Sequence, residues 1–247
     1  MAEFVSKETM KRIISDIKTL RKEPLNTHGI YYEHDDTDML LGRALIIGPA
    51  DTPYADGFYL FKFKFPTNYP HEPPVVEFCT SDGRTRFNPN LYRSGKVCLS
   101  ILNTWEGEQW SGCQTISTVL LALCTILNDT PLLNEPGVTK QHHDYANYNK
   151  IIAYKNYEIA IIEMLLRPPS DFATFQPIMR EHFEREKEHI KAKLTSAAGT
   201  SSAGTSSAGT SSEGTGTGTS TGTITTGLYK MTFHIDYAQV LYNFNLV

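Results

Sequence analysis

The sequence has 247 residues, of which 40% are hydrophobic, 20% charged and 11% aromatic, which is typical of a folded protein rather than a disordered chain. Lys and Arg number 23 against 27 Asp and Glu, and the resulting net charge of −4 lacks the basic excess typical of nucleic-acid-binding proteins. The longest notable apolar run, residues 119–127, is far shorter than the ~18 residues that a membrane-spanning helix requires. Residues 1–12 mix acidic and basic side chains, so no secretory signal is predicted. We therefore expect neither nucleic acid nor a membrane as a partner.

The cysteines and histidines indicate free thiols and no metal. The four cysteines show no CxxC spacing, and they are Cys79, Cys98, Cys113 and Cys124. A disulfide framework is unusual in a chain of this length, which favours an intracellular, reducing compartment such as the cytoplasm or nucleus. The histidines at 142, 143, 182 and 189 have no Cys or His partners at zinc-site spacing, so we predict no metal.

A change in composition divides the chain. Residues 195–223 contain repeated pentads of Ser, Ala, Gly and Thr, which cannot bury enough apolar surface to offset the entropy of ordering. We predict a flexible linker there, between a folded unit at 1–194 and a short apolar and aromatic tail at 224–247. In the tail Met231, Phe233 and Ile235 alternate with polar residues, which predicts a strand. The tail is too short for its own core, so it either docks or stays mobile.

The folded unit begins with helical periodicity and continues with strands. Residues 6–22 are predicted to form a helix, with Ser6 as a candidate N-cap and Pro24 beyond the end. Its apolar stripe consists of Met10, Ile13, Ile14, Ile17 and Leu20. Four strand-like runs with short connections predict an antiparallel meander, at residues 29–34, 39–47, 58–65 and 75–78. Helical stripes follow at residues 115–127, 145–166 and 175–194. Strands followed by helices predict an α+β fold.

The irregular stretch 79–112 is the place to seek a functional site, because loops of such length in a compact domain are usually functional. It contains FNPNLYRSGKVCLSIL, in which turn signals at Asn88-Pro89-Asn90 and Ser94-Gly95 precede Cys98. Taken alone, a cysteine between apolar neighbours is more often a buried structural thiol.

The surrounding segments resemble the ubiquitin-conjugating enzyme family over roughly residues 6–167. Those that carry the resemblance are, in order, MKRIISDIKTLRKEP, IIGPADTPYADG, FPTNYPHEPPVVEF, NPN eight residues before Cys98, Trp110-Ser111 and TISTVLLALCTIL. CLSILNTW, NEPG and the long helix that follows are closest to the larger members, which have Ser two residues after the cysteine and a long helical C-terminal extension. The resemblance implies the ubiquitin-conjugating fold for the unit at 1–194.

The resemblance also implies an activity. Cys98 would accept ubiquitin or a ubiquitin-like protein from an activating enzyme as a thioester and transfer it to a lysine amine or a ligase cysteine. ATP would be used upstream, so no bound cofactor is expected. Asn90 is the candidate donor to the oxyanion and also a turn residue, two roles that can coexist. Ser100, which replaces the family's usual Asp, or Asp129 would assist lysine deprotonation, although an Asp at a helix end is more often a cap.

Four residues match the family's surface for the activating enzyme and for RING or HECT-type ligases, namely Lys11, Arg12, His71 and Ser111. Without the resemblance, the basic first helix would be read as a solvated face. Protein substrates complete the expected partners.

Two other functions remain open from the sequence. A catalytically weak, ubiquitin-conjugating-like binding module typically lacks the cysteine, whereas Cys98 is present. A thiol hydrolase requires a His to activate the thiol, and residues 87–102 contain none.

Overall fold

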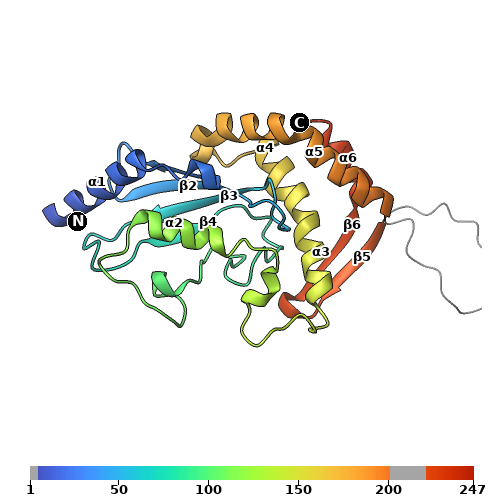
Figure 1. Cartoon of the computed structure of the whole chain (residues 1–247), viewed down its shortest axis with the longest axis horizontal. Coiled ribbons are helices and arrows are strands. Elements are labelled where there is room, and N and C mark those ends of the chain that lie inside the picture. The colour runs from blue at the N-terminus through green and yellow to red at the C-terminus, as the bar shows by residue number, and fades with distance from the viewer. Residues whose placement is uncertain (1–4, 201–220) are drawn as a thin grey trace, which may run out of the picture.

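A four-stranded antiparallel sheet lies at the centre of the structure, a computed structural model that describes residues 5–200 and 221–247 (Figure 1). Its strands follow the chain in the order β1-β2-β3-β4, with bounds Ile30–His34, Leu41–Ile47, Phe58–Lys64 and Val75–Phe78. The predicted meander is confirmed. The second strand begins two residues later than expected because Asp38 forms a turn, in which its carboxylate accepts from Leu40 N and its carbonyl accepts from Leu41 N.

Helices flank the sheet, which confirms the α+β class. The helices are α1 Lys7–Lys22, α2 Ile116–Thr125, α3 Tyr145–Lys155, α4 Met164–Leu166, α5 Gln176–Thr200 and α6 Tyr237–Phe244. The first helix starts where Ser6 Oγ accepts from Thr9 N at 3.0 Å, as the sequence predicts. Thr115 and Thr118 cap α2 reciprocally. Among the described residues, every helix is too short or too polar to span a bilayer.

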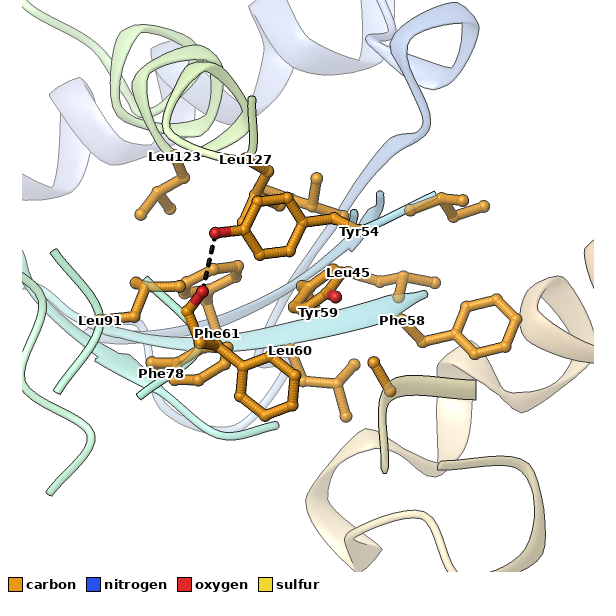
Figure 2. Close-up of a cluster of buried hydrophobic side chains, with 14 of the residues drawn as sticks. Leu45, Tyr54, Phe58, Tyr59, Leu60, Phe61, Phe78, Leu91, Leu123 and Leu127 are labelled. Atoms are coloured by element: carbon orange, nitrogen blue, oxygen red, sulfur yellow. Dashed lines mark hydrogen bonds between the residues drawn. The ribbon is translucent and has the colours of Figure 1, made fainter. Parts of the chain in front are cut away.

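The core is centred on β3, which is buried on both faces. Phe58, Tyr59, Leu60 and Phe61 are each 0% exposed. Tyr54, from the loop before β3, packs its ring on Tyr59 with the centroids 5.5 Å apart (Figure 2). Its hydroxyl donates to the main-chain carbonyl of residue 87 at 2.7 Å, the bond drawn in Figure 2. The core thus anchors the segment that leads to Cys98.

The predicted helix 145–166 is wrong as a single α-helix. A π-helix, Asn156–Glu163, separates α3 from α4. Asn156 is buried there, accepting from the Tyr59 hydroxyl at 2.6 Å and donating to the Ala55 carbonyl at 2.8 Å. An apolar stripe indicates which face of a helix is buried and does not specify the hydrogen-bond register, so the widened turn was not predictable.

The C-terminal tail folds onto the helices. Strand β5, Thr221–Thr226, pairs with β6, Met231–Asp236, in which Met231, Phe233 and Ile235 are buried as their alternation predicts. The hairpin lies beside α3 and α6 lies beside α5 (Figure 1). The parts of the expected linker that the structure describes, 195–200 and 221–223, belong to α5 and β5, and 201–220 lie outside the described residues. The division into unit, linker and tail stays a prediction.

Candidate active site

Cys98 and Asn90 are joined by two reciprocal hydrogen bonds. The Cys98 N–H donates to the Asn90 carbonyl at 2.9 Å, and Asn90 Nδ2 donates to the Cys98 carbonyl at 2.6 Å. An isolated bridge between Leu91 and Val97 lies inside this pair, and the short 3-10 helix Ser100–Leu102 follows it. Cys98 is only 1% exposed. The structure therefore brings together the two residues that the sequence spacing placed at the site, on a turn whose backbone is fixed.

The Asn90 side chain acts within the turn. Its Nδ2 carries two N–H donors, of which the bond to Cys98 uses one. Its Oδ1 is buried and has no hydrogen-bond partner. The turn role expected from the sequence is therefore present, and a second donor remains on the same nitrogen.

Asn88 is the buried centre of the turn. It is 0% exposed, and its Nδ2 donates at 2.8 Å both to the Tyr54 hydroxyl and to the Ile126 carbonyl. Its Oδ1 accepts from Asn90 N at 2.9 Å and from Asn134 Nδ2 at 3.2 Å. An amide supplies both the donors and the acceptor that these partners require. Tyr54 and Asn134 lie in segments that resemble the family, but nothing in the sequence indicated that either meets Asn88, because these contacts form only through the fold.

Ser100 and Asp129, the two residues expected to assist lysine deprotonation, lie in different surroundings. Ser100 begins the 3-10 helix beside Cys98, and the exposed loop 103–109 folds back over it at Gly107. Gly107 has φ +127°, and a Cβ there would lie 3.1 Å from the Ser100 Cβ. Asp129 is exposed and accepts from the Thr130 hydroxyl at 3.2 Å. Within the described ranges, no hydrogen bond joins Asp129 to Cys98, Asn90 or Ser100.

Arg86 is a site residue that sequence reasoning missed. Its side chain is buried, and its Nε and Nη2 donate to the carbonyls of Asn88 at 3.1 Å and Pro89 at 2.6 Å. Its guanidinium carbon lies 3.3 Å from the centroid of the Tyr92 ring. Its partners are carbonyls and aromatic faces rather than a carboxylate, so no charge pattern could reveal it.

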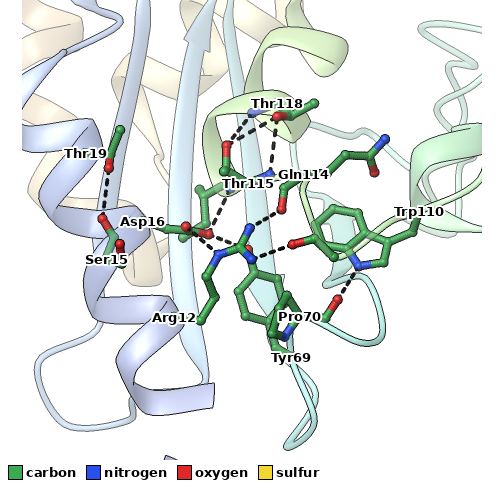
Figure 3. Close-up of polar contacts among 12 residues, drawn as sticks. Arg12, Ser15, Asp16, Thr19, Tyr69, Pro70, Trp110, Gln114, Thr115 and Thr118 are labelled. Carbon is green, nitrogen blue, oxygen red and sulfur yellow. Dashed lines mark hydrogen bonds and ion pairs between the residues drawn. The ribbon is translucent and has the colours of Figure 1, made fainter. Parts of the chain in front are cut away.

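The expected partner surface is assembled from three segments, which are α1, the loop at residues 110–114 and the segment at residues 70–71 (Figure 3). Arg12 on α1 pairs with Asp16 at 2.8 Å and donates to the carbonyls of Gly112 and Gln114 at 2.5 Å each. Trp110 Nε1 donates to the Pro70 carbonyl at 2.7 Å, and this bond joins the loop 110–114 to the segment that contains His71. Arg12 thus holds the loop of Ser111 against α1, a structural role that the sequence did not indicate.

The other three partner candidates are exposed around this junction. His71 Nε2 lies 3.4 Å from Glu8 Oε1, with both side chains about two-thirds exposed (65% and 67%), so this pair adds little stability. A groove in this region is lined by Lys7, Glu8, Lys11, Arg12 and Pro70. Lys11, His71 and Ser111 thus share one accessible surface of mixed charge.

The remaining three cysteines lie outside the turn formed by Asn90 and Cys98. All four cysteines are free. Burial, followed by the nearby Glu77 carboxylate, raises the pKa of Cys79 to about 11, and burial also raises the pKa of Cys124. Because the thiolate is the nucleophile, Cys79 and Cys124 are less reactive near neutral pH than a cysteine of ordinary pKa. Cys113 is exposed in the loop that Arg12 holds.

One group of potential ligands comes together outside the site. Ligand atoms of His142, His143 and Asp144 lie within 4.8 Å of one another. However, the Asp144 carboxylate oxygens accept from Gly227 N at 3.0 Å and Leu228 N at 2.7 Å. This carboxylate therefore already serves the C-terminal tail, and the absence of a metal stays a prediction.

Comparison with known proteins identifies the family of the chain. The family model described as "Ubiquitin-conjugating enzyme" matches residues 12–156, more than half of the chain, and the chain belongs to this family. The resemblance found in the sequence is thus confirmed.

Individual relatives point the same way. The chain is 45% identical over 166 residues to "Ubiquitin-conjugating enzyme E2 Z" of Xenopus tropicalis, which covers 66% of this chain and 52% of that protein. Human "Ubiquitin-conjugating enzyme E2 Z" is 43% identical over 166 residues, covering 66% and 46%. "Probable ubiquitin-conjugating enzyme E2 24" of Arabidopsis thaliana is 36% identical over 198 residues, covering 76% and 21%. The matched part spans about half the length of the E2 Z relatives, at 52% and 46%.

Proposed function

We propose that the chain accepts ubiquitin or a ubiquitin-like protein from an activating enzyme as a Cys98 thioester and transfers it to a lysine amine or a ligase cysteine. The observation that carries this proposal is the reciprocal bonding of Cys98 and Asn90, found in a member of the ubiquitin-conjugating family. The partners are the activating enzyme, a RING or HECT-type ligase and protein substrates. ATP is consumed upstream, and the chain binds no cofactor of its own.

The chemistry is two acyl transfers at one sulfur. The Cys98 thiolate attacks the carbonyl carbon of the incoming thioester, a new carbon–sulfur bond forms, and the activating enzyme's thiolate leaves. In the second step an amine nitrogen attacks the same carbon, the amide forms, and the Cys98 thiolate leaves. An oxyanion develops on the carbonyl in this step, and the second Asn90 N–H is the donor for it. Ser100 or Asp129 assists the loss of the amine's proton, and of the two only the Asp129 carboxylate is a base near neutral pH.

The burial of Cys98 adds a requirement. A residue that is 1% exposed cannot meet a carbonyl carbon without displacement of its neighbours. The loop 103–109 is exposed and folds back at Ser100, two residues after Cys98. Local opening beside Cys98 therefore belongs to the reaction cycle.

Lys11, Arg12, His71 and Ser111 form the surface that receives the activating enzyme and ligases. Lys11, His71 and Ser111 are exposed, Lys11 lines a groove together with Arg12 and Pro70, and Arg12 holds the loop that bears Ser111. We place the chain in an intracellular, reducing compartment, because an oxidised Cys98 would be unable to accept an acyl group. All four thiols are free, in agreement with that proposal.

The two alternatives have less support. A binding module without catalysis has no need for a thiol and an amide held at this spacing. A thiol hydrolase requires a His to activate Cys98, and in the part of the chain that the structure describes no histidine hydrogen-bonds this residue.

A charging assay tests the proposal. Purified chain is incubated with activating enzyme, ATP and a panel of modifiers, and the products are separated on a non-reducing gel. We expect an adduct that thiol reagents remove, and that Cys113→Ala retains but Cys98→Ala loses. An adduct that survives in Cys98→Ala contradicts the assignment.

A further inference from the structure

The turn between β5 and β6 lies against the segment that precedes Cys98. The Tyr229 carbonyl accepts from Arg93 Nη2 at 2.5 Å, and the Tyr229 ring centroid lies 5.1 Å from the Arg86 guanidinium carbon. The main-chain N–H of Arg86 donates to Met231 Sδ at 3.3 Å. The tail therefore contacts Arg86 through both its backbone and its side chain. It does so from beyond residues 12–156, the part that the family model matches.

Several bonds hold the turn in this position. The buried Asp144 carboxylate accepts from Gly227 N and Leu228 N, and the Tyr229 hydroxyl donates to Glu135 Oε2 at 2.5 Å. Tyr229 and the next residue, Lys230, have φ values of 60° and 46°. Such values are unfavourable for residues with a Cβ and persist where the surroundings impose them. The positive φ values belong to the tight turn between β5 and β6, and the bonds to Asp144 and Glu135 fix where that turn lies.

Arg86 depends on these aromatic contacts. It is 9% exposed, and none of the ion pairs among the described residues involves it. Its charge is balanced by two carbonyls and by the faces of Tyr92 and Tyr229. Removal of the Tyr229 ring would admit water, and a hydrated guanidinium no longer needs the carbonyls of Asn88 and Pro89. Those carbonyls immediately precede Asn90.

We propose that Tyr229 is a positioning residue for the active-site turn: through Arg86 it holds residues 88–90 and thereby keeps Asn90 aligned with Cys98. The C-terminal tail, whose role the sequence left open, is in this view a support for the site. The catalytic meaning of this inference rests on the proposed function, whereas its structural meaning does not.

Hydrogen exchange on the full chain tests the positioning without any modifier. The amides to follow are those of Asn90 and Cys98, since both are hydrogen-bonded within the turn. Tyr229→Asn removes the ring with a residue that tolerates positive φ. We expect both amides to exchange about tenfold faster in this variant, while amides in β3 keep their rates.

Two variants serve as controls. Tyr229→Phe keeps the ring over Arg86 and loses only the bond to Glu135, so we expect exchange at both amides to stay much closer to the parent's rate than in Tyr229→Asn. Tyr242→Asn makes the same substitution on α6 at a side chain that is 63% exposed, and should leave the turn unchanged. If Tyr229→Asn fails to fold, Tyr229→Gly removes the ring with the residue that best accepts this backbone, and the same exchange is expected of it.

Activity supplies the second readout. For the ubiquitin-charged chain, Tyr229→Asn should slow discharge to free lysine about tenfold, with a smaller effect on charging. Unchanged exchange at Asn90 and Cys98 in the folded variant overturns the proposal, as does equal acceleration in β3, which would show general destabilisation. If no variant or parent chain forms a thioester, the proposed function fails, and the exchange rates still decide the positioning role.

Discussion

The side-chain amide of Asn90 donates to the main-chain carbonyl of Cys98 at 2.6 Å. The candidate oxyanion donor therefore also stabilises the turn that contains the candidate nucleophile. One of its two N–H groups makes this bond, which leaves the other N–H for the oxyanion in the proposed mechanism. Under that proposal, the same asparagine has a structural and a catalytic role.

Replacement of Asn90 by Ala should therefore have two separable effects. Discharge of the thioester to free lysine should slow by about 10²-fold, the usual scale for losing one oxyanion donor. Charging should suffer less, because it depends mainly on the Cys98 thiolate. Single-turnover rates for the two steps, measured beside the melting temperature, make the comparison. Equal losses in both steps would assign Asn90 a purely structural role.

Asn88 should matter for stability. It is 0% exposed and its amide serves four partners, so Asn88→Ala leaves buried polar groups unpaired. We expect the free energy of unfolding to fall by at least about 1–3 kcal/mol, the cost of one such group. Urea denaturation measures this loss, with the exposed Asn245→Ala as the matched control, expected within about 0.5 kcal/mol of the parent. Equal free energies of unfolding for Asn88→Ala and Asn245→Ala would contradict the stabilising role of the buried Asn88 amide.

The stability of the β5–β6 hairpin should depend on pH, because the Asp144 carboxylate accepts hydrogen bonds from its turn. Burial alone would raise the pKa of Asp144, but hydrogen bonds from Leu228 N and Gly227 N outweigh burial and lower the pKa below the ordinary value for an aspartate. A group with a lowered folded-state pKa stabilises the fold above its unfolded-state pKa and loses that contribution as the pH falls through the folded-state value. The hairpin should therefore lose hydrogen-exchange protection below about pH 4.

Asp144→Asn provides the comparison. It should weaken the protection of the hairpin at neutral pH and flatten its pH dependence, because the charged acceptor is gone. Parallel pH profiles for the parent chain and Asp144→Asn would show that another group is responsible.

Arg12 and Lys11 are neighbours on α1 with different expected roles. Arg12 makes three polar contacts within the chain, whereas Lys11 is exposed. Arg12→Ala should lower both the stability and the rate of charging, with a stability loss of about 1–3 kcal/mol. Lys11→Ala should affect charging alone and keep the free energy of unfolding within about 0.5 kcal/mol of the parent. Thermal unfolding and the KM for the charged activating enzyme distinguish the two. A stable Arg12→Ala variant would contradict its structural role.

Local patterns predicted most of the elements. The alternation around Phe61 and Phe233 and the cap at Ser6 depend on near neighbours in the sequence, so they could be seen without the fold. The spacing of Asn90 and Cys98 was recognisable because one short turn joins them.

Relationships between distant segments were not predictable. Arg93 and Tyr229 are 136 positions apart, and the tail's alternation indicated a strand without indicating what it would cover. The two bonds of Arg12 to the carbonyls of Gly112 and Gln114, and the buried bonds of Asn156, also join segments that meet only after folding. The expectation that Asp129 assists catalysis stays a prediction, since in the part of the chain that the structure describes this exposed residue bonds to its neighbour Thr130 and not to the turn.

The chemical nature of the adduct on Cys98→Ser tests the central claim most directly. The full chain and this variant are incubated with activating enzyme, ATP and ubiquitin, and each product is treated with a thiol reagent and, separately, with hydroxide. We predict that the parent's adduct is removed by the thiol reagent, whereas Cys98→Ser forms an oxyester that resists it and yields to hydroxide. A thiol-sensitive adduct that persists on Cys98→Ser would place the acyl group on Cys79, Cys113 or Cys124 and contradict the account.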